Sequence, residues 1–243
     1  MNKLIVAGII TLFATSANAF DLGQTFDYSK SHKFTDSDWN ATFVRGCGYL
    51  KPKPDFLTWH KEDGDKFARF TLNPSDKEGR CKVDNKKNRS RAEIKTTKRM
   101  KLGNSYSFQA NVRFNEQVNG KVIFMQVHAT RPGCKQKPPV KVVLNNSHRN
   151  IQIASLGTWE ETFTRGMLDV GKWATVKIVL TNLGKNGTMD LYINDVHLIK
   201  DRKTSIQKSC AKPFGKIGLF ALKKGENTVS ADFDDVKMEQ IKD

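Results

Sequence analysis

The chain is patterned as short runs in which apolar and polar residues alternate, and turn residues separate the runs. Lys66–Leu72, for example, alternates and then stops at Asn73-Pro74-Ser75. A period of two is typical of strands with one buried face, and clusters of Gly, Asn and Pro mark turns. No segment keeps a 3.6-residue apolar period for three turns. The other expected strands are Arg89–Thr97, Ser105–Phe114, Lys121–Ala129, Val140–Leu144, Asn150–Ala154, Thr175–Thr181, Thr188–Ile193, Lys216–Leu222 and Thr228–Met238.

Closely spaced strands without intervening helices predict an all-β sandwich or barrel. A length of 243 residues suits one all-β domain. We expect a single domain because neither a repeat nor a shift in composition marks a boundary.

The alternation also predicts which side chains share a face of a strand. In Arg89–Thr97, Ala92 and Ile94 point into a core. The opposite face then forms a charged ridge of Arg89, Arg91, Glu93 and Lys95. In Lys121–Ala129, we expect Ile123, Met125, Val127 and Ala129 on the core face, and Val122, Phe124, Gln126 and His128 on the other.

The first nineteen residues are predicted to be a signal peptide. Lys3 gives a positive start, Leu4–Ala14 is largely apolar, and Ala17-Asn18-Ala19 has the small residues at which signal peptidase cleaves. The apolar run is too short to span a bilayer, and no later segment is suited to membrane insertion. We therefore expect a secreted or periplasmic domain comprising residues 20–243.

Export changes how the cysteines are interpreted. Cys47, Cys81, Cys134 and Cys210 form an even set in an oxidising compartment, so two disulfides are expected, in any of three pairings. A metal site is disfavoured because no C-x-x-C or clustered His and Cys spacing occurs.

The charge predicts a polyanionic partner. Forty-one Lys and Arg oppose twenty-five Asp and Glu, which gives a net charge of +16. Charge alone does not distinguish nucleic acid, anionic lipid and acidic glycan. Because an exported protein rarely meets nucleic acid, we expect no nucleic acid partner and favour an anionic polysaccharide.

The residues that could carry chemistry lie on the two strands described above. The arginine fork binds a carboxylate or sulfate in two places at once. His128 shares its face with Gln126, and an imidazole with a pKa near 6.5 suits proton abstraction at neutral pH. No serine-hydrolase elbow, P-loop, dinucleotide motif or H-E-x-x-H motif occurs. Asp232 and Asp234 share a face and leave a glycoside hydrolase as a weak option, although solvated surface acids are the simpler interpretation.

Three short motifs occur in an order that resembles a known enzyme family. They are Arg91-Ala92-Glu93-Ile94-Lys95, Gln126-Val127-His128 and Lys216-Ile217-Gly218-Leu219-Phe220. They resemble the R-S/T-E-L-R, Q-I/V-H and K-A-G-x-Y strands of the concanavalin A-like jelly-roll polysaccharide lyases, which include alginate lyases and the heparin lyase I-like group. Pro138–Leu144 also resembles a strand of that family, and the likeness spans about Arg89 to Met238.

The resemblance implies a jelly-roll β-sandwich that cleaves a uronate polysaccharide by β-elimination. Such an enzyme neutralises the C5 carboxylate, removes the C5 proton and protonates the departing O4 oxygen. Carried over by position, Arg91 and Gln126 would bind and polarise the carboxylate, and His128 would act as base or assist it. Substrate contacts are expected from Arg89, Glu93, Lys95, Lys141 and Lys216.

One position departs from the family pattern. Phe220 stands where the late motif carries a tyrosine, and it can neither give nor take a proton. The alternatives are that Tyr28, Tyr49, Tyr106 or Tyr192 does this work, that His128 makes both proton transfers, or that the protein is a glycan-binding module that does not cut. We expect a monomer without a cofactor, and a calcium requirement stays open. The sequence does not specify the polymer, its sulfation, endo or exo action, or the disulfide pairing.

Overall fold

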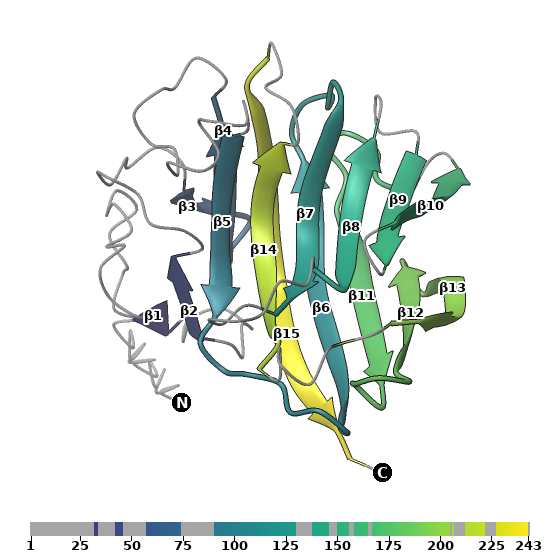
Figure 1. The fold of residues 1–243 in the computed structure, drawn as a ribbon. Coiled ribbons are helices and arrows are strands. Elements are labelled where there is room, and N and C mark those ends of the chain that lie inside the picture. The colour runs from purple at the N-terminus through teal and green to yellow at the C-terminus, as the bar shows by residue number, and fades with distance from the viewer. Residues whose placement is uncertain are drawn as a thin grey trace, which may run out of the picture.

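The computed structural model describes side chains at residues 57–73, 91–129, 138–145, 151, 167–204, 206, 212–221 and 227–242. It also describes the strand backbone at 32–33, 42–45, 90, 150, 152–155 and 158–164. These residues form strands and turns, without a helix, and the strands build two antiparallel sheets stacked face to face (Figure 1). The predicted all-β sandwich is confirmed.

The sheet in front in Figure 1 has eight strands and the sheet behind it has seven. In spatial order, the eight-stranded sheet contains β1 (His32–Lys33), β2 (Thr42–Arg45), β5 (Ser90–Thr96), β14 (Phe214–Ala221), β7 (Lys121–His128), β8 (Val140–Asn145), β9 (Asn150–Ser155) and β10 (Thr158–Thr164). The seven-stranded sheet contains β13 (Val196–Lys203), β12 (Thr188–Ile193), β11 (Ala174–Thr181), β6 (Ser105–Phe114), β15 (Val229–Ile241), β4 (Asp65–Leu72) and β3 (Leu57–Glu62).

All ten expected strands are present, with ends that agree to within three residues. The pattern did not predict β1, β2, β3, β10 and β13. The β13 segment shows why, because most of its residues are at least partly exposed and it therefore lacks an apolar alternation. Strands that pair at a sheet edge without burying a face leave little signal in the sequence.

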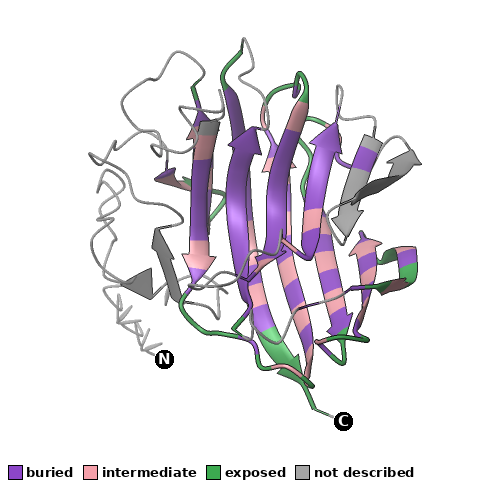
Figure 2. Cartoon of the chain, viewed as in Figure 1, coloured by how far each residue is buried: buried purple, intermediate pink, exposed green. Residues whose placement is uncertain are grey.

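The core lies between the two sheets and is rich in phenylalanine (Figure 2). Phe70 of β4 meets Phe233 of β15 edge to face at 5.2 Å between ring centroids, and Phe114 meets Phe124 in the same way at 5.4 Å. Edge-to-face contacts suit the charge distribution of aromatic rings. In β6, buried and half-buried residues alternate along the whole strand, as expected for one buried face.

A bulge in β7 changes the predicted faces of that strand. Ile123 pairs with Val143 of β8, but Met125 pairs with Val142, so the register shifts between them. As a result Phe124 and Met125 both belong to the main core. Ile123 instead packs outside the core in a small cluster with Val143 and Phe220. The predicted side of the strand was therefore wrong for Ile123 and Phe124, and also for Val122, which belongs to the main core.

Asp232 was expected to be a solvated surface acid, and the structure shows it fully buried. Its carboxylate accepts hydrogen bonds from Arg69 at 2.6 and 3.0 Å, from Arg113 at 2.9 and 3.0 Å, and from Asn115 at 3.0 Å. An acid held by two guanidinium groups is a structural ion pair. Asp232 is therefore a poor candidate for a hydrolytic acid pair with Asp234.

Several predictions concern parts of the chain outside the described residues. The signal peptide at 1–19 and the cysteines Cys47, Cys81, Cys134 and Cys210 are among them. Among the described residues there is no helix that is long and apolar enough to cross a membrane.

Candidate functional site

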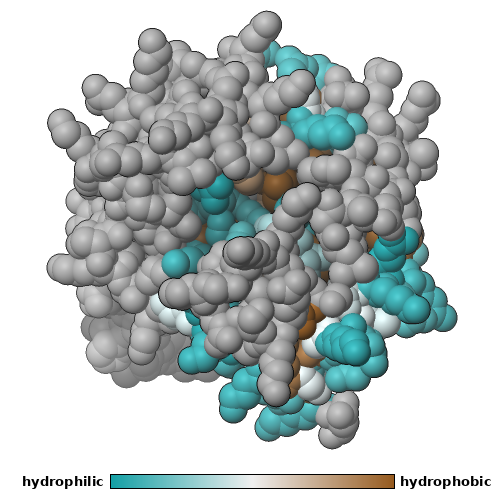
Figure 3. Space-filling view, viewed as in Figure 1, coloured by the Kyte–Doolittle hydropathy of each residue, from teal (hydrophilic) through white to brown (hydrophobic). Residues whose placement is uncertain are grey.

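The outer face of the eight-stranded sheet carries the predicted site residues. We call the outward-facing side chains of β5, β14, β7 and β8 the site face. The strand register places four of these side chains in one row across the face. Lys216 lies opposite Lys95 on one side and Gln126 on the other, and Gln126 lies opposite Lys141. Figure 3 views this sheet from outside and shows hydrophilic atoms beside a hydrophobic patch in a hollow near its middle.

Glu93 occupies the centre of the site face. Its carboxylate accepts a hydrogen bond from Lys216 Nζ at 3.0 Å and a short one from Gln126 Nε2. Arg91 Nη1 lies 3.2 Å from Glu93 Oε2. Glu93, Gln126 and Lys216 are all buried, with 2%, 2% and 3% of their surface exposed. The short contacts join three of the strands through one carboxylate.

Glu93, Gln126, Lys216 and Arg91 form a cluster. Arg91 is its most accessible member, with 18% of its side chain exposed. Its guanidinium carbon lies 4.1 Å from the centre of the Phe220 ring, which is opposite it in the register. Stacking on an aromatic ring orients a guanidinium and leaves its edges available for an anion. Arg91 is therefore placed to meet a negatively charged group at the surface of the cluster.

His128 lies at the end of β7, opposite Phe214. The two rings stack with centroids 5.5 Å apart and planes at 21°. Burial, followed by the charges of Lys216, Arg91 and Lys141, lowers the pKa of His128 to about 3. Its Nδ1 is buried and has no hydrogen-bond partner among the described residues. The imidazole is therefore neutral at physiological pH and can accept a proton.

Phe214 also contacts two cations. The guanidinium carbon of Arg99 lies 4.2 Å from the ring centre, and Lys95 Nζ lies 5.8 Å from it. Burial lowers the pKa of Lys95, and the charges of Arg99 and Lys216 lower it further. The phenyl ring thus contacts both the imidazole and these cations.

The ring beside His128 is Phe214, whereas Phe220 packs on Arg91. The family resemblance makes Phe220 the position at which this chain lacks a phenol. The structure shows that Phe214, which also lacks a hydroxyl, faces the imidazole.

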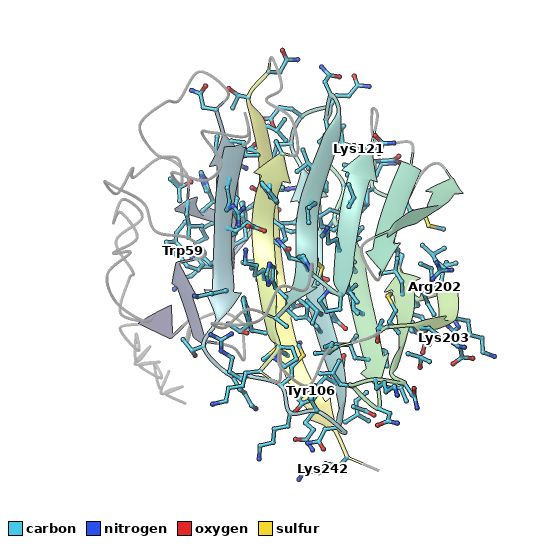
Figure 4. All side chains as sticks on the ribbon, in the orientation of Figure 1. Trp59, Tyr106, Lys121, Arg202, Lys203 and Lys242 are labelled. Atoms are coloured by element: carbon cyan, nitrogen blue, oxygen red, sulfur yellow. The ribbon has the colours of Figure 1, made fainter. Side chains whose placement is uncertain are left out.

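The described tyrosines belong to the other sheet. Tyr106 lies in β6, near the lower end of the sandwich in Figure 4, and its hydroxyl accepts a hydrogen bond from the Lys101 N–H at 2.8 Å. Tyr192 lies in β12 and stacks on His197. Neither phenol is placed to serve His128. Tyr28 and Tyr49 lie outside the described residues.

The structure therefore brings together most of the predicted site residues. Arg91, Gln126, His128, Glu93, Lys95, Lys141 and Lys216 share the site face, and Arg89 lies outside the described residues. Sequence reasoning missed Phe214 and Arg99. Phe214 was detectable, because it is two residues before Lys216 and so shares its face. Arg99 follows the end of β5, where alternation gives no information.

The described residues contain no group of three or more His, Cys, Asp or Glu side chains that could hold a metal ion. The cations of the site face would also repel one. The geometry instead suits a polyanion, since a neutral base lies beside several fixed positive charges.

Known structures share this fold. A family 7 alginate lyase, A1-II′, solved with product, aligns at a TM-score of 0.56 with 16% identity over 80% of this chain and 86% of that one. Alginate lyase AlyC3 aligns at 0.54 with 14% identity over 77% of this chain and 79% of that one. The catalytic domain of a glycoside hydrolase family 131 protein from Coprinopsis cinerea aligns at 0.57 with 10% identity over 81% and 82%.

These similarities establish the sandwich, which lyases and a hydrolase share. Comparison with curated proteins gives no match. The sequence model described as polysaccharide lyase, however, matches residues 27–237 and thus most of the chain. With the site face described above, this match shows that the chain belongs to the polysaccharide lyase family.

Proposed function

We propose that the protein is an exported lyase that cleaves a uronate polysaccharide by β-elimination at the site face. One observation carries the proposal: Arg91 of β5 and Gln126 and His128 of β7 converge around the same cluster. This arrangement combines donors for a carboxylate with a neutral base. The predicted signal peptide and the net charge of +16 support export and an anionic substrate.

The reaction needs three steps that these groups can perform. Arg91 binds the C5 carboxylate, and Gln126 polarises it, so that negative charge developing at C5 is stabilised. His128 takes the C5 proton. The C5–H electrons form the C4–C5 double bond, the C4–O4 bond breaks, and O4 receives a proton. We assign this second transfer to His128 as well, because the imidazolium formed in the first step carries the proton that O4 needs.

Substrate binding would make His128 a better base. Its pKa is about 3 in the free protein, partly because Lys216, Arg91 and Lys141 lie nearby. A uronate carboxylate bound to these cations offsets their charge and favours proton uptake by the imidazole. Substrate therefore brings the counter-charge that the site needs.

A product assay tests the proposal. Mature protein is incubated with alginate, glucuronan, heparin and related polymers, with and without calcium, and absorbance of unsaturated uronates is recorded. We expect signal on at least one polymer. Reducing ends without the unsaturated chromophore would indicate a hydrolase and contradict β-elimination. Absence of product on every uronate polymer, across pH, would also contradict the proposal.

Assignment of both proton transfers to His128 makes a separate prediction. The variants Tyr28→Phe and Tyr49→Phe, single and combined, should keep turnover within about twofold of the wild type, because neither phenol takes part. A loss of about 100-fold or more in either one, the scale of a lost general acid, would move the second transfer to that tyrosine.

A second candidate is a glycan-binding module of the same fold. The observation that favours it is Phe214, a ring without a hydroxyl beside His128. Binding of a uronate oligosaccharide without product, unchanged in His128→Ala, would select this candidate over the lyase.

A further inference from the structure

Glu93 was expected to contact substrate, and its surroundings indicate another role. Only 2% of its surface is exposed. Its carboxylate is bound by Lys216 Nζ and Gln126 Nε2, and Arg91 Nη1 lies within 3.2 Å. A buried carboxylate that already accepts from an ammonium and an amide and pairs with a guanidinium has little capacity for a sugar hydroxyl. It would also repel a substrate carboxylate.

The path of the Glu93 side chain explains how it reaches all three partners. Glu93 lies on β5 and Gln126 on β7, with β14 between them. Neighbouring strands are about 4.8 Å apart, so the Glu93 and Gln126 side chains together bridge roughly two such spacings and meet over β14. The β14 residue opposite Glu93 is Gly218, and its lack of a Cβ lets β14 approach the β5 backbone closely at Ala92 and Glu93. One carboxylate thus ties a strand to its second neighbour.

The charges in the cluster depend on this carboxylate. Lys216 is 3% exposed, and an ammonium buried to this degree requires a counter-charge. Glu93 supplies it at 3.0 Å. Without Glu93, Lys216 and Arg91 would repel each other, and the Gln126 amide would lose the acceptor that holds its orientation.

We infer that Glu93 is a positioning residue: it does not touch substrate but holds Gln126, Lys216 and Arg91 in the arrangement that receives the uronate carboxylate. This inference rests on the proposed function. Under this inference, the site recognises a carboxylate through all three donors together, because the same acceptor, Glu93, aligns each of them.

The test compares Glu93→Ala and Glu93→Gln with Asp232→Asn. Asp232 is the matched control, since it is also a buried acid held by arginines but belongs to the other sheet. Misplaced donors should reduce kcat about 10- to 100-fold in Glu93→Ala and change KM less than about threefold. Glu93→Gln keeps the length and one acceptor and should retain part of the activity. Asp232→Asn should lower Tm and leave kcat unchanged at a temperature where it is folded.

Two results would overturn the inference. A lower KM with unchanged kcat in Glu93→Gln would mean that Glu93 faces the substrate directly and opposes its charge. A normal kcat in Glu93→Ala would mean that the donors need no alignment.

A readout that does not depend on catalysis separates this inference from the proposed function. The side-chain amide of Gln126, assigned in NMR spectra by its loss in Gln126→Glu, should exchange slowly with solvent in the wild type and Asp232→Asn. It should exchange fast in Glu93→Ala. If the wild type makes no unsaturated product but this pattern holds, the lyase proposal fails and the positioning role stands. Unchanged exchange in Glu93→Ala refutes the positioning role whatever the activity.

Discussion

At the scale of single residues, His128 is held in the neutral form that the proposed base requires. Removal from water is the main cause of its lowered pKa, and three cations add to it. Each effect disfavours the imidazolium, so the free protein keeps a lone pair available across the neutral range. The same cations that lower the pKa are the groups expected to bind the substrate.

This shift predicts a dependence of stability on pH. An unfolded histidine titrates near 6.5 and His128 in the folded protein near 3. Between these values the unfolded state binds more protons, so stability falls as pH falls from about 6.5 toward 3. The slope is at most about 1.4 kcal/mol per pH unit for one group. Urea denaturation of wild type and His128→Gln at several pH values measures it.

The comparison isolates His128 from the other titrating groups. His60 also has a lowered pKa, mainly from burial, and contributes equally to both proteins. The stability difference between wild type and His128→Gln should therefore change with pH in this window. A difference that stays constant from pH 7 to pH 4 would contradict the lowered pKa.

Alternation predicted much of the site from the sequence. It placed Arg91, Glu93 and Lys95 on one face of one strand, and Gln126 and His128 on one face of another. It could not show that Glu93 turns its carboxylate toward Gln126, because contacts between strands depend on their register. Register in turn depends on bulges and packing that a single strand does not encode.

At the scale of strands, irregularities fix which side chains meet. The bulge in β7 turns Ile123 outward onto Phe220 and Val143 while Phe124 enters the core. The sequence Lys121–Ala129 is apolar on both sides, so either phase buries hydrophobic residues. Pairing with the neighbouring strands decides which residues face the core, and the alternation in this segment could not predict that.

Gly218 is the second irregularity, and it makes a testable prediction. Its φ is +113°, a region that other residues rarely adopt, and a Cβ there would lie 2.2 Å from the Ala92 carbonyl oxygen. Gly218→Ala must therefore shift β14 against β5, where Glu93 passes. We expect a loss of about 2 kcal/mol or more in urea denaturation, together with lower kcat.

Gly184→Ala is the control for this substitution. A Cβ at Gly184 meets nothing closer than 4.0 Å, and its φ is not in the positive range given for Gly218. Its stability should be within about 1 kcal/mol of the wild type. Equal effects of the two substitutions would mean that the close approach at Gly218 is relieved at no cost.

At the scale of the whole molecule, the two sheets use charge differently. On the seven-stranded sheet, Arg69 and Arg113 pair with the buried Asp232, and Arg113 also pairs with Glu62. Among the described residues, the site face carries one acid, Glu93, and four cations, Arg91, Lys95, Lys141 and Lys216. This excess of positive charge on one face supports the proposed binding of a polyanion there.

This distribution predicts a salt dependence for substrate binding. Raising salt from about 0.1 M to about 1 M shortens the Debye length from about 10 Å to about 3 Å, so KM should rise. Lys141→Ala should flatten that rise. Arg202→Ala, which changes a charge at the β12–β13 edge labelled in Figure 4, should leave it unchanged. A KM independent of salt would argue against electrostatic recognition.

The measurement that most directly tests the central claim is the rate of unsaturated product formation in His128→Asn and His60→Asn, on the polymer that the wild type cleaves best. His60 is the matched control, because it is a partly buried histidine of the other sheet. We predict that His128→Asn loses on the order of 10²- to 10⁴-fold in kcat and that His60→Asn keeps the wild-type rate. A wild-type rate in His128→Asn would contradict the account.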